Sequence, residues 1–268
     1  MARPMQDCVV LFGDSITSRQ DVPQSLQALM GDTYRRTLDI LNRGYGGFNT
    51  TFTRPLLDQI FARKEDAAHV PVVRLITIWL GTNDAALPPS EQHVPVETYT
   101  ANLRYFMDEL TSPSSPYAVS STEGLNIVLI TPPAVLTTMR EPEWNRKPSL
   151  TKQYVDACLQ VAEEWKAKQA GKTWRVGSID AWNAIINAAG GEGEELRPFF
   201  TDGLHLSTEG YAAVWGEYKK LVKTDFKGRG LDWEDVDDLP MRVPLWDEVD
   251  YDDPESVVKR MKLPPIRQ

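Results

Sequence analysis

The residues that build disulfide frameworks and zinc sites are scarce in this sequence. Its 268 residues include two cysteines, Cys8 and Cys158, and three histidines, His69, His93 and His205. Two cysteines exclude a disulfide framework and a four-cysteine zinc site. Cys8 lies inside an apolar run, which favours an ordinary core position. The cysteines therefore predict neither a covalent clamp nor a metal site.

Long hydrophobic runs are missing as well. The apolar run nearest the N-terminus, residues 8–12, is too short for the hydrophobic region of a signal peptide. No stretch reaches the roughly 18 apolar residues that a membrane-spanning helix needs. We therefore expect a cytoplasmic protein without a membrane span.

Positive charge is in deficit. The chain has 29 Lys and Arg against 38 Asp and Glu, a formal net charge of −9. This balance argues against nucleic acid or anionic lipid as a partner, because phosphate groups are bound by basic surfaces. Between residues 225 and 255 there are twelve acidic residues and three basic ones, so the rest of the chain is neutral. One C-terminal segment carries the whole excess.

Five short apolar runs rich in Val, Ile and Leu alternate with longer amphipathic stretches. The runs predict strands buried on both faces, at residues 8–12, 37–41, 72–80, 125–130 and 174–179. The stretches predict helices at residues 23–30, 54–64, 96–110, 149–170 and 207–226. Strands that alternate with helices indicate an α/β fold, a three-layer α/β/α sandwich around a five-stranded parallel sheet. We expect one domain over residues 1–226 and an acidic extension with Trp and Pro over 227–268.

A serine follows the first predicted strand, in the stretch GDSIT at residues 13–17. Reactive groups of open parallel sheets gather where the strands end, and Ser15 in such a turn presents its hydroxyl there. The stretch is not the G-x-S-x-G turn of α/β-hydrolases. The alternative is that Ser15 or Asp14 caps the next helix.

Two further polar motifs follow the next two predicted strands. The stretch NRGYGGFNT at 42–50 has three glycines, which permit a tight turn with an outward backbone N–H, a candidate oxyanion donor. The stretch GTND at 81–84 offers the amide of Asn83 as a donor that does not titrate. A plain turn and an Asx turn are the alternatives.

The fourth motif is DGLH at residues 202–205, just before a predicted helix. A carboxylate three residues before an imidazole can bond its Nδ1–H, which leaves Nε2 to take a proton from a hydroxyl. Alone, Asp202 and His205 would be an ordinary surface pair. Together the four motifs supply a nucleophile, oxyanion donors, a base and its orienting group.

With these four motifs the chain resembles the SGNH (GDSL) hydrolase superfamily, whose four blocks carry Ser, Gly, Asn and His. The blocks are Ser15, Gly47, Asn83 and His205, in the family's order from residue 13 to 210. The stretches LGTNDAALP, EQHVPVETYTANL and ITPP further resemble its isoamyl acetate-hydrolysing esterase group. The resemblance implies a flavodoxin-like sandwich, and it explains the acidic extension poorly.

The resemblance implies a serine esterase that cleaves short-chain esters of small alcohols through an acyl-enzyme. Ser15 would attack, His205 would take its proton and Asp202 would hold His205. No cofactor and no metal are needed, since a base already activates the nucleophile. Small neutral esters are the expected partners, with a homo-oligomer possible.

The oxyanion hole implied by the family consists of the backbone N–H groups of Ser15 and Gly47 and the amide of Asn83. Asp14 would shape the turn rather than transfer a proton. Three alternatives stay open: a carbohydrate O-deacetylase, a thioesterase or lysophospholipase of the same superfamily, and an inert relative that only binds.

Overall fold

The computed structural model of the chain describes residues 4–19, 21–140 and 144–262. One sheet of five parallel strands, in the order β2-β1-β3-β4-β5, lies at its centre. The strands are β1 (Asp7–Gly13), β2 (Leu38–Gly44), β3 (Val73–Trp79), β4 (Asn126–Ile130) and β5 (Arg175–Ile179). The prediction of an α/β fold with a five-stranded parallel sheet is confirmed.

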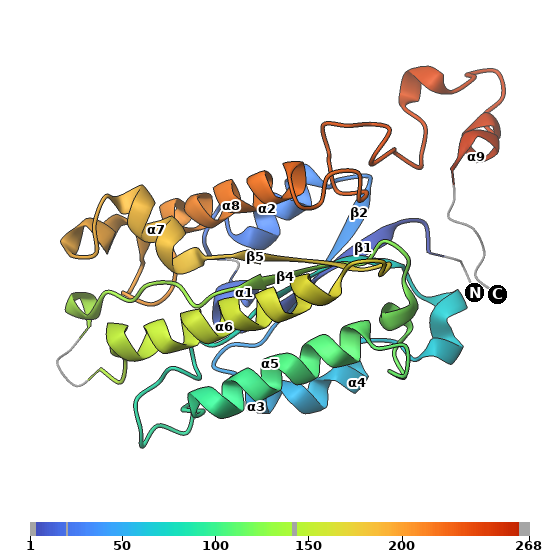
Figure 1. Cartoon of the computed structure of the whole chain (residues 1–268). Helices are drawn as coiled ribbons and strands as arrows, with labels where there is room; N and C mark the ends of the chain where they lie inside the picture. Colours follow the sequence, from blue (N-terminus) through green and yellow to red (C-terminus); the bar gives the residue numbers. More distant parts are fainter. Residues whose placement is uncertain (1–3, 20, 141–143, 263–268) are drawn as a thin grey trace.

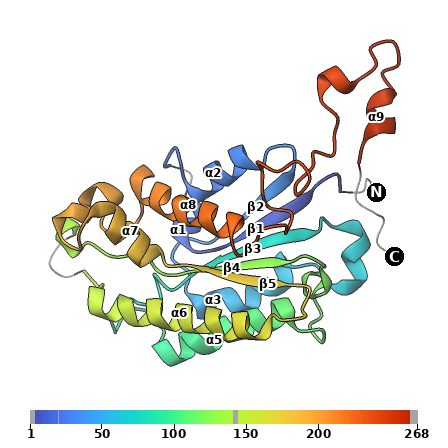
Figure 2. The ribbon, with the colours of Figure 1, turned by 45° about the horizontal axis from the view of Figure 1, so that its top comes forward.

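Helices cover both faces of this sheet, so the molecule has three layers (Figures 1 and 2). On one face lie α2 (Leu26–Thr33), α7 (Ala181–Ala189) and α8 (Thr208–Lys223). On the other lie α3 (Thr50–Thr53), α4 (Leu57–Ile60), α5 (Val96–Thr111) and α6 (Pro148–Lys168). A single turn, α1 (Ser15–Ser18), follows β1.

The buried side chains of β1 contribute to an apolar cluster on each face of the sheet. Val9 and Leu11 belong to the apolar cluster under α2 and α8. Cys8, Val10 and Phe12 belong to the cluster under α5 and α6. Successive side chains of a strand point to opposite faces, so a strand covered on both sides has to be apolar throughout. This is why the continuous apolar runs were good predictors of strands.

One helix prediction was wrong, and one helix was missed. Residues 54–64 do not form one helix: a 3-10 turn with Pro55 in it precedes α4, which ends before Phe61 because that residue is extended. The helix α7 was not predicted at all. Its nine residues follow β5 closely, between the Asp180 side chain that caps its start and the left-handed Gly190 that ends it.

The apolar core continues past residue 226 into the acidic extension. Leu231 is fully buried, and the Trp233 ring stacks on that of Trp215 with 5.8 Å between centroids. Trp233 is thus partly buried against the core. Trp246 and Tyr251, further along the extension, are each 73% exposed.

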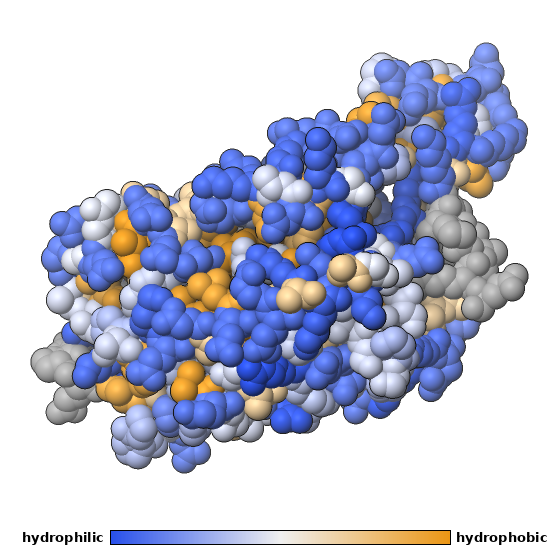
Figure 3. Space-filling model, in the orientation of Figure 1, coloured by the Kyte–Doolittle hydropathy of each residue, from blue (hydrophilic) through white to orange (hydrophobic). Residues whose placement is uncertain are grey.

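The exposed aromatic residues lie on a segment that projects from the layers. Residues 240–262, which end with the short helix α9 (Ser256–Arg260), extend away from the sandwich (Figures 1 and 2). Hydrophobic side chains lie among hydrophilic ones on this segment (Figure 3). Residues 263–268, the end of the predicted extension, lie outside the described part.

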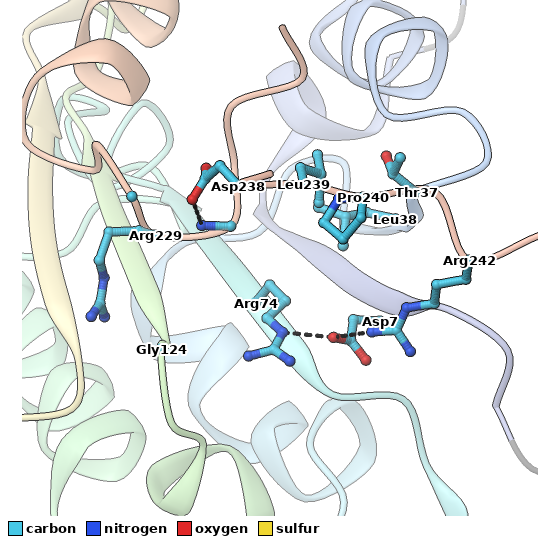
Figure 4. A pocket seen from close by; sticks show the side chains of 12 residues that line it. Asp7, Thr37, Leu38, Arg74, Gly124, Arg229, Asp238, Leu239, Pro240 and Arg242 are labelled. Carbon is cyan, nitrogen blue, oxygen red and sulfur yellow. Dashed lines mark hydrogen bonds and ion pairs between the residues drawn. The ribbon is translucent and has the colours of Figure 1, made fainter. Parts of the chain in front are cut away.

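A cavity of about 350 Å³ marks the place where the extension meets the sheet (Figure 4). Arg74 Nε, from β3, donates to Asp7 Oδ2, from β1, at 2.6 Å. Arg242 Nη2, from the extension, donates to the same oxygen at 2.7 Å. Through Arg242, the Asp7 carboxylate fastens the projecting segment to the end of the sheet at which β1 begins. Ser15 lies at the opposite end of the sheet.

Candidate active site

The polar motifs meet at one edge of the sheet. Ser15, Gly47 and Asn83 follow β1, β2 and β3, which are neighbours in the sheet. His205 lies in the turn before α8. Because the carboxyl ends of parallel strands share an edge, residues from distant parts of the chain meet there.

Ser15 opens α1 directly after the end of β1. Asp14 caps this turn: its Oδ1 accepts a hydrogen bond from the backbone N–H of Ile16 at 2.9 Å. Complete burial raises the pKa of the Asp14 carboxyl to about 7. Its second oxygen has no partner among the described residues. Asp14 therefore fixes the backbone beside Ser15, and its own carboxyl points away from solvent.

Ser15, His205 and Asp202 form a chain of hydrogen bonds. Ser15 Oγ lies 2.9 Å from His205 Nε2, and His205 Nδ1 lies 2.8 Å from Asp202 Oδ2. The other oxygen, Asp202 Oδ1, accepts from the backbone N–H groups of His205 and Leu204. Burial alone would raise the pKa of Asp202, but these hydrogen bonds hold it well below its usual range.

The ionised carboxylate of Asp202 determines which tautomer the His205 imidazole adopts. A carboxylate only accepts hydrogen bonds, so Nδ1 of His205 carries a proton toward Asp202. In the neutral ring Nε2 is then an acceptor, and it faces the hydroxyl of Ser15. The arrangement can remove a proton from that hydroxyl.

Arg140 is a member of this group that the sequence did not predict. Its Nε donates to the backbone oxygen of Asp202 at 2.8 Å, and its guanidinium also pairs with the Asp202 carboxylate. Arg140 comes just after the 3-10 turn Thr137–Met139, in the loop that joins β4 to α6. The sequence signal for it is weak: a stretch with several prolines directly after a predicted strand. Residues 141–143 of the loop lie outside the described part.

Hydrogen bonds join Asn83 to the loop that contains Gly47. Gly47 has a φ of +80°, a left-handed conformation that favours glycine. The Asn83 side chain donates from Nδ2 to the carbonyl of Phe48 at 2.8 Å, which joins the two loops. The backbone N–H groups of Ser15 and Gly47 have no partner among the described residues. Both groups are therefore candidate hydrogen-bond donors to a ligand.

A second buried carboxylate stands behind these loops. Asp84 accepts hydrogen bonds from the backbone N–H of Thr50 at 3.0 Å and from the Thr50 hydroxyl. It thereby fixes the start of α3. Burial raises the pKa of Asp84 to about 6. The positive charge of Arg146, which is 5% exposed, acts against this rise of the Asp84 pKa.

The described residues hold no group of three or more His, Cys, Asp or Glu side chains placed to bind a metal ion. Within the same ranges, no helix combines the length and the apolar character that a membrane crossing requires.

Comparisons with known proteins identify the family to which the chain is similar. A family model described as GDSL-like Lipase/Acylhydrolase family matches residues 11–213. The isoamyl acetate-hydrolyzing esterase 1 homolog of Bos taurus is 32% identical, over 92% of this chain and 90% of its own length. A GDSL esterase/lipase of Arabidopsis thaliana is 29% identical, over 97% of this chain and 100% of its own.

Solved structures share the fold at lower identity. The lipase/acylhydrolase of Enterococcus faecalis superposes with a TM-score of 0.56 at 24% identity, over 81% of this chain and 95% of its own. The acetylxylan esterase Axe2 of Geobacillus stearothermophilus gives 0.57 at 18% identity, over 86% and 96%.

Proposed function

The chain belongs to the GDSL-like lipase/acylhydrolase family and is a carboxylic ester hydrolase, and we propose that it cleaves short-chain esters, acetates of small alcohols foremost, through an acyl-enzyme on Ser15. The observation that carries this proposal is the hydrogen-bonded chain from Ser15 Oγ through His205 to Asp202. The proposed nucleophile, its base and the group that orients the base are thus in hydrogen-bond contact.

In the proposed reaction, Ser15 Oγ attacks the ester carbonyl while its proton passes to His205 Nε2. Asp202 stabilises the imidazolium that forms, because it stays ionised. His205 then gives the proton to the leaving alcohol, and the acyl group remains on Ser15. Water attacks this acyl-enzyme while His205 accepts its proton. His205 then returns that proton to Ser15 Oγ as the carboxylic acid leaves, which restores the free enzyme.

The oxyanion of each tetrahedral intermediate would be bound by three donors. These are the backbone N–H groups of Ser15 and Gly47 and the side-chain amide of Asn83. Support comes from the two unpartnered N–H groups and from the amide's second N–H, which also lacks a partner among the described residues. Fixed donors aimed at a developing negative charge are a large source of catalysis.

The proposed preference for a short acyl chain is supported by the names of the relatives. The mammalian relatives are named after isoamyl acetate hydrolysis, which supports acetate as the acyl group. The neutral charge of the chain outside residues 225–255 suits an uncharged substrate.

The test is turnover of p-nitrophenyl esters from acetate to octanoate by the wild type and by Ser15→Ala. We expect acetate turnover to vanish in Ser15→Ala and wild-type kcat/KM to fall steeply beyond about butyrate. Equal rates in both proteins would refute Ser15 as the nucleophile. A maximum at octanoate would indicate a lipase-like or thioesterase member instead.

A further inference from the structure

Two side chains outside the proposed mechanism hold the amide of Asn83. Gln92 Nε2 donates to Asn83 Oδ1 at 3.2 Å, and Arg146 Nη2 approaches the same oxygen at 3.4 Å. We infer that Gln92 and Arg146 are positioning residues, which orient the Asn83 amide so that its free N–H faces the carbonyl oxygen under attack. The inference rests on the proposed function, in which Asn83 is an oxyanion donor.

An amide side chain fits its surroundings in two orientations, because its oxygen and its NH₂ group are similar in shape. The two orientations exchange an acceptor for a donor. An Asn83 turned the wrong way would present Oδ1 to the oxyanion and repel it. The site therefore needs something that selects one orientation.

Arg146 fixes the orientation of the Gln92 amide, because a guanidinium only donates hydrogen bonds. Its Nη2 donates to Gln92 Oε1 at 3.2 Å, so the NH₂ group of Gln92 has to point the other way, toward Asn83. Asn83 Oδ1 accepts from that group, and Asn83 Nδ2 turns toward the carbonyl of Phe48. A flipped Asn83 would set donor against donor at Gln92 and acceptor against acceptor at Phe48.

Gln92 also reaches the second loop of the site. Its Nε2 donates to the backbone oxygen of Gly47 at 3.0 Å. One side chain thus contacts two of the three proposed donors, Asn83 through its amide oxygen and Gly47 through its carbonyl. A change at Gln92 is expected to disturb both.

Arg146 is itself held firmly. Its Nε donates to the backbone oxygen of Thr82 at 3.1 Å, and its Nη1 donates to Asn145 Oδ1 at 2.7 Å. Burial lowers the pKa of Arg146 to about 10, while the carboxylates of Asp14 and Asp84 oppose that effect. The guanidinium is therefore charged, and a pure donor, at neutral pH.

The experiment compares kcat and KM for p-nitrophenyl acetate in Gln92→Glu and Gln92→Met. The carboxylate of Gln92→Glu only accepts, so it attracts the Asn83 NH₂ group and turns Oδ1 toward the reacting carbonyl. We expect kcat to fall in Gln92→Glu by about tenfold or more, toward the ~10²–10³-fold cost of a lost oxyanion donor, with KM little changed. The loss in Gln92→Met should be smaller.

A role in packing alone predicts the opposite order, since Glu resembles Gln in shape more closely than Met does. Wild-type kcat in Gln92→Glu, or a greater loss in Gln92→Met, would overturn the inference. Gln153→Glu, on the exposed surface of α6, is the matched control and should keep wild-type kcat.

A double-mutant comparison tests whether Gln92 acts through Asn83. Added to Asn83→Ala, Gln92→Glu should lower kcat by less than about threefold, because the amide that it would turn is gone. A full repeat of its single-mutant loss would mean that the new charge acts directly on the site, which contradicts the inference.

Arg146→Lys tests the first step, because a lysine ammonium lacks the forked geometry that serves Gln92 and Asn83 together. We expect a lower kcat with a Tm near that of the wild type. Arg104→Met, which removes a surface ion pair with Glu164 on α5 and α6, is the control and should keep kcat. Loss of activity in Ser15→Ala and Asn83→Ala but not in Gln92→Glu would refute this inference alone. Retained activity in Ser15→Ala would refute the proposed function.

Discussion

A substitution at Asn83 tests the proposed oxyanion hole separately from the Ser15–His205–Asp202 chain. The Asn83 side chain does not titrate and, within the described part of the chain, makes no hydrogen bond to Ser15 Oγ or His205. Asn83→Ala is expected to lower kcat about 10²–10³-fold and to leave KM within a few-fold, since the lost donor acts on charge that develops in the transition state. Steady-state kinetics with p-nitrophenyl acetate measure this. The exposed Asn187→Ala on α7 is the control. An unchanged kcat in Asn83→Ala would remove the residue from the mechanism.

Asp84 links the stability of the fold to pH. Burial raises its pKa from 3.8 to about 6, so between these values the folded state binds more protons than the unfolded state. The free energy of unfolding therefore falls as pH rises through this window. Asp84→Asn removes the contribution. We expect the free energy of unfolding of the variant, relative to that of the wild type, to rise between about pH 4 and 6 and then to level off. Urea unfolding at several pH values measures it; a constant difference across the window would contradict the assignment.

The residues that the sequence predicted at the site share one property: each lies in a short motif whose neighbours are visible along the chain. Ser15 follows a strand, and Asp202 is three residues from His205. Arg140 pairs with Asp202, which is 62 positions away in the sequence, and Arg146 contacts Asn83, which is 63 positions away. No local pattern marks such contacts, because they form only when the loops after different strands meet. Gln92 lies inside the stretch EQHVPVETYTANL, yet its contact with Gly47 also forms only when loops that are distant in the sequence come together.

At the scale of elements, central strands were predictable because burial on both faces demands apolar residues at every position. The edge strand β2 was less regular, since most of its residues are only partly buried. Helix ends were shifted by a few residues: the predicted 207–226 became Thr208–Lys223. The short helices α1 and α3 escaped prediction, because four residues carry no periodicity. They depend instead on the caps that Asp14 and Asn49 supply.

The turn between Asp202 and His205 depends on the backbone of Gly203. Its φ is +86°, and a Cβ atom there would lie 2.3 Å from the backbone oxygen of Leu136. Gly203→Ala is therefore expected to displace the turn that holds Asp202 and His205, with lower kcat and a Tm lower by several degrees. Kinetics and thermal unfolding measure both.

Gly216→Ala on α8 is the matched control for this substitution. Nothing lies within 4 Å of a Cβ at Gly216, and alanine favours a helix by up to about 1 kcal/mol over glycine. We expect a slightly higher Tm and an unchanged kcat. Similar behaviour of the two variants would show that the turn at Gly203 does not control the site.

At the scale of the whole molecule, the residue at which the acidic segment begins is not the residue at which the folded core ends. The acidic segment was predicted to lie outside a domain ending at 226. Leu231 is part of the core cluster, however, and Trp233 packs against it. The sequence could not show this, because two apolar residues among acids have no periodicity. We propose that the folding unit includes residues 227–239 and that the segment from 240 onward is an appendage.

Two truncations test this boundary. A chain that ends after Leu239 should keep a Tm close to that of the full chain. It loses the ion pair of Arg242 with Asp7 and the hydrogen bonds from Arg36 to the backbone of residues 243 and 244, but it keeps the apolar contacts of Leu231 and Trp233. A chain that ends after Phe226 removes Leu231 and Trp233, so its Tm should fall by on the order of 10 °C. Equal Tm values for all three chains would place the boundary at 226 after all.

The central claim, an acyl-enzyme on Ser15, is tested most directly by trapping the covalent adduct. The wild type is treated with a p-nitrophenyl alkylphosphonate, which phosphonylates activated serine hydroxyls, and is then digested for peptide mass spectrometry. The account predicts one phosphonyl group per chain, on Ser15, with esterase activity lost in proportion to labelling and no labelling in His205→Ala. Full activity in the labelled protein, or a label on another residue that accompanies the loss, would contradict it.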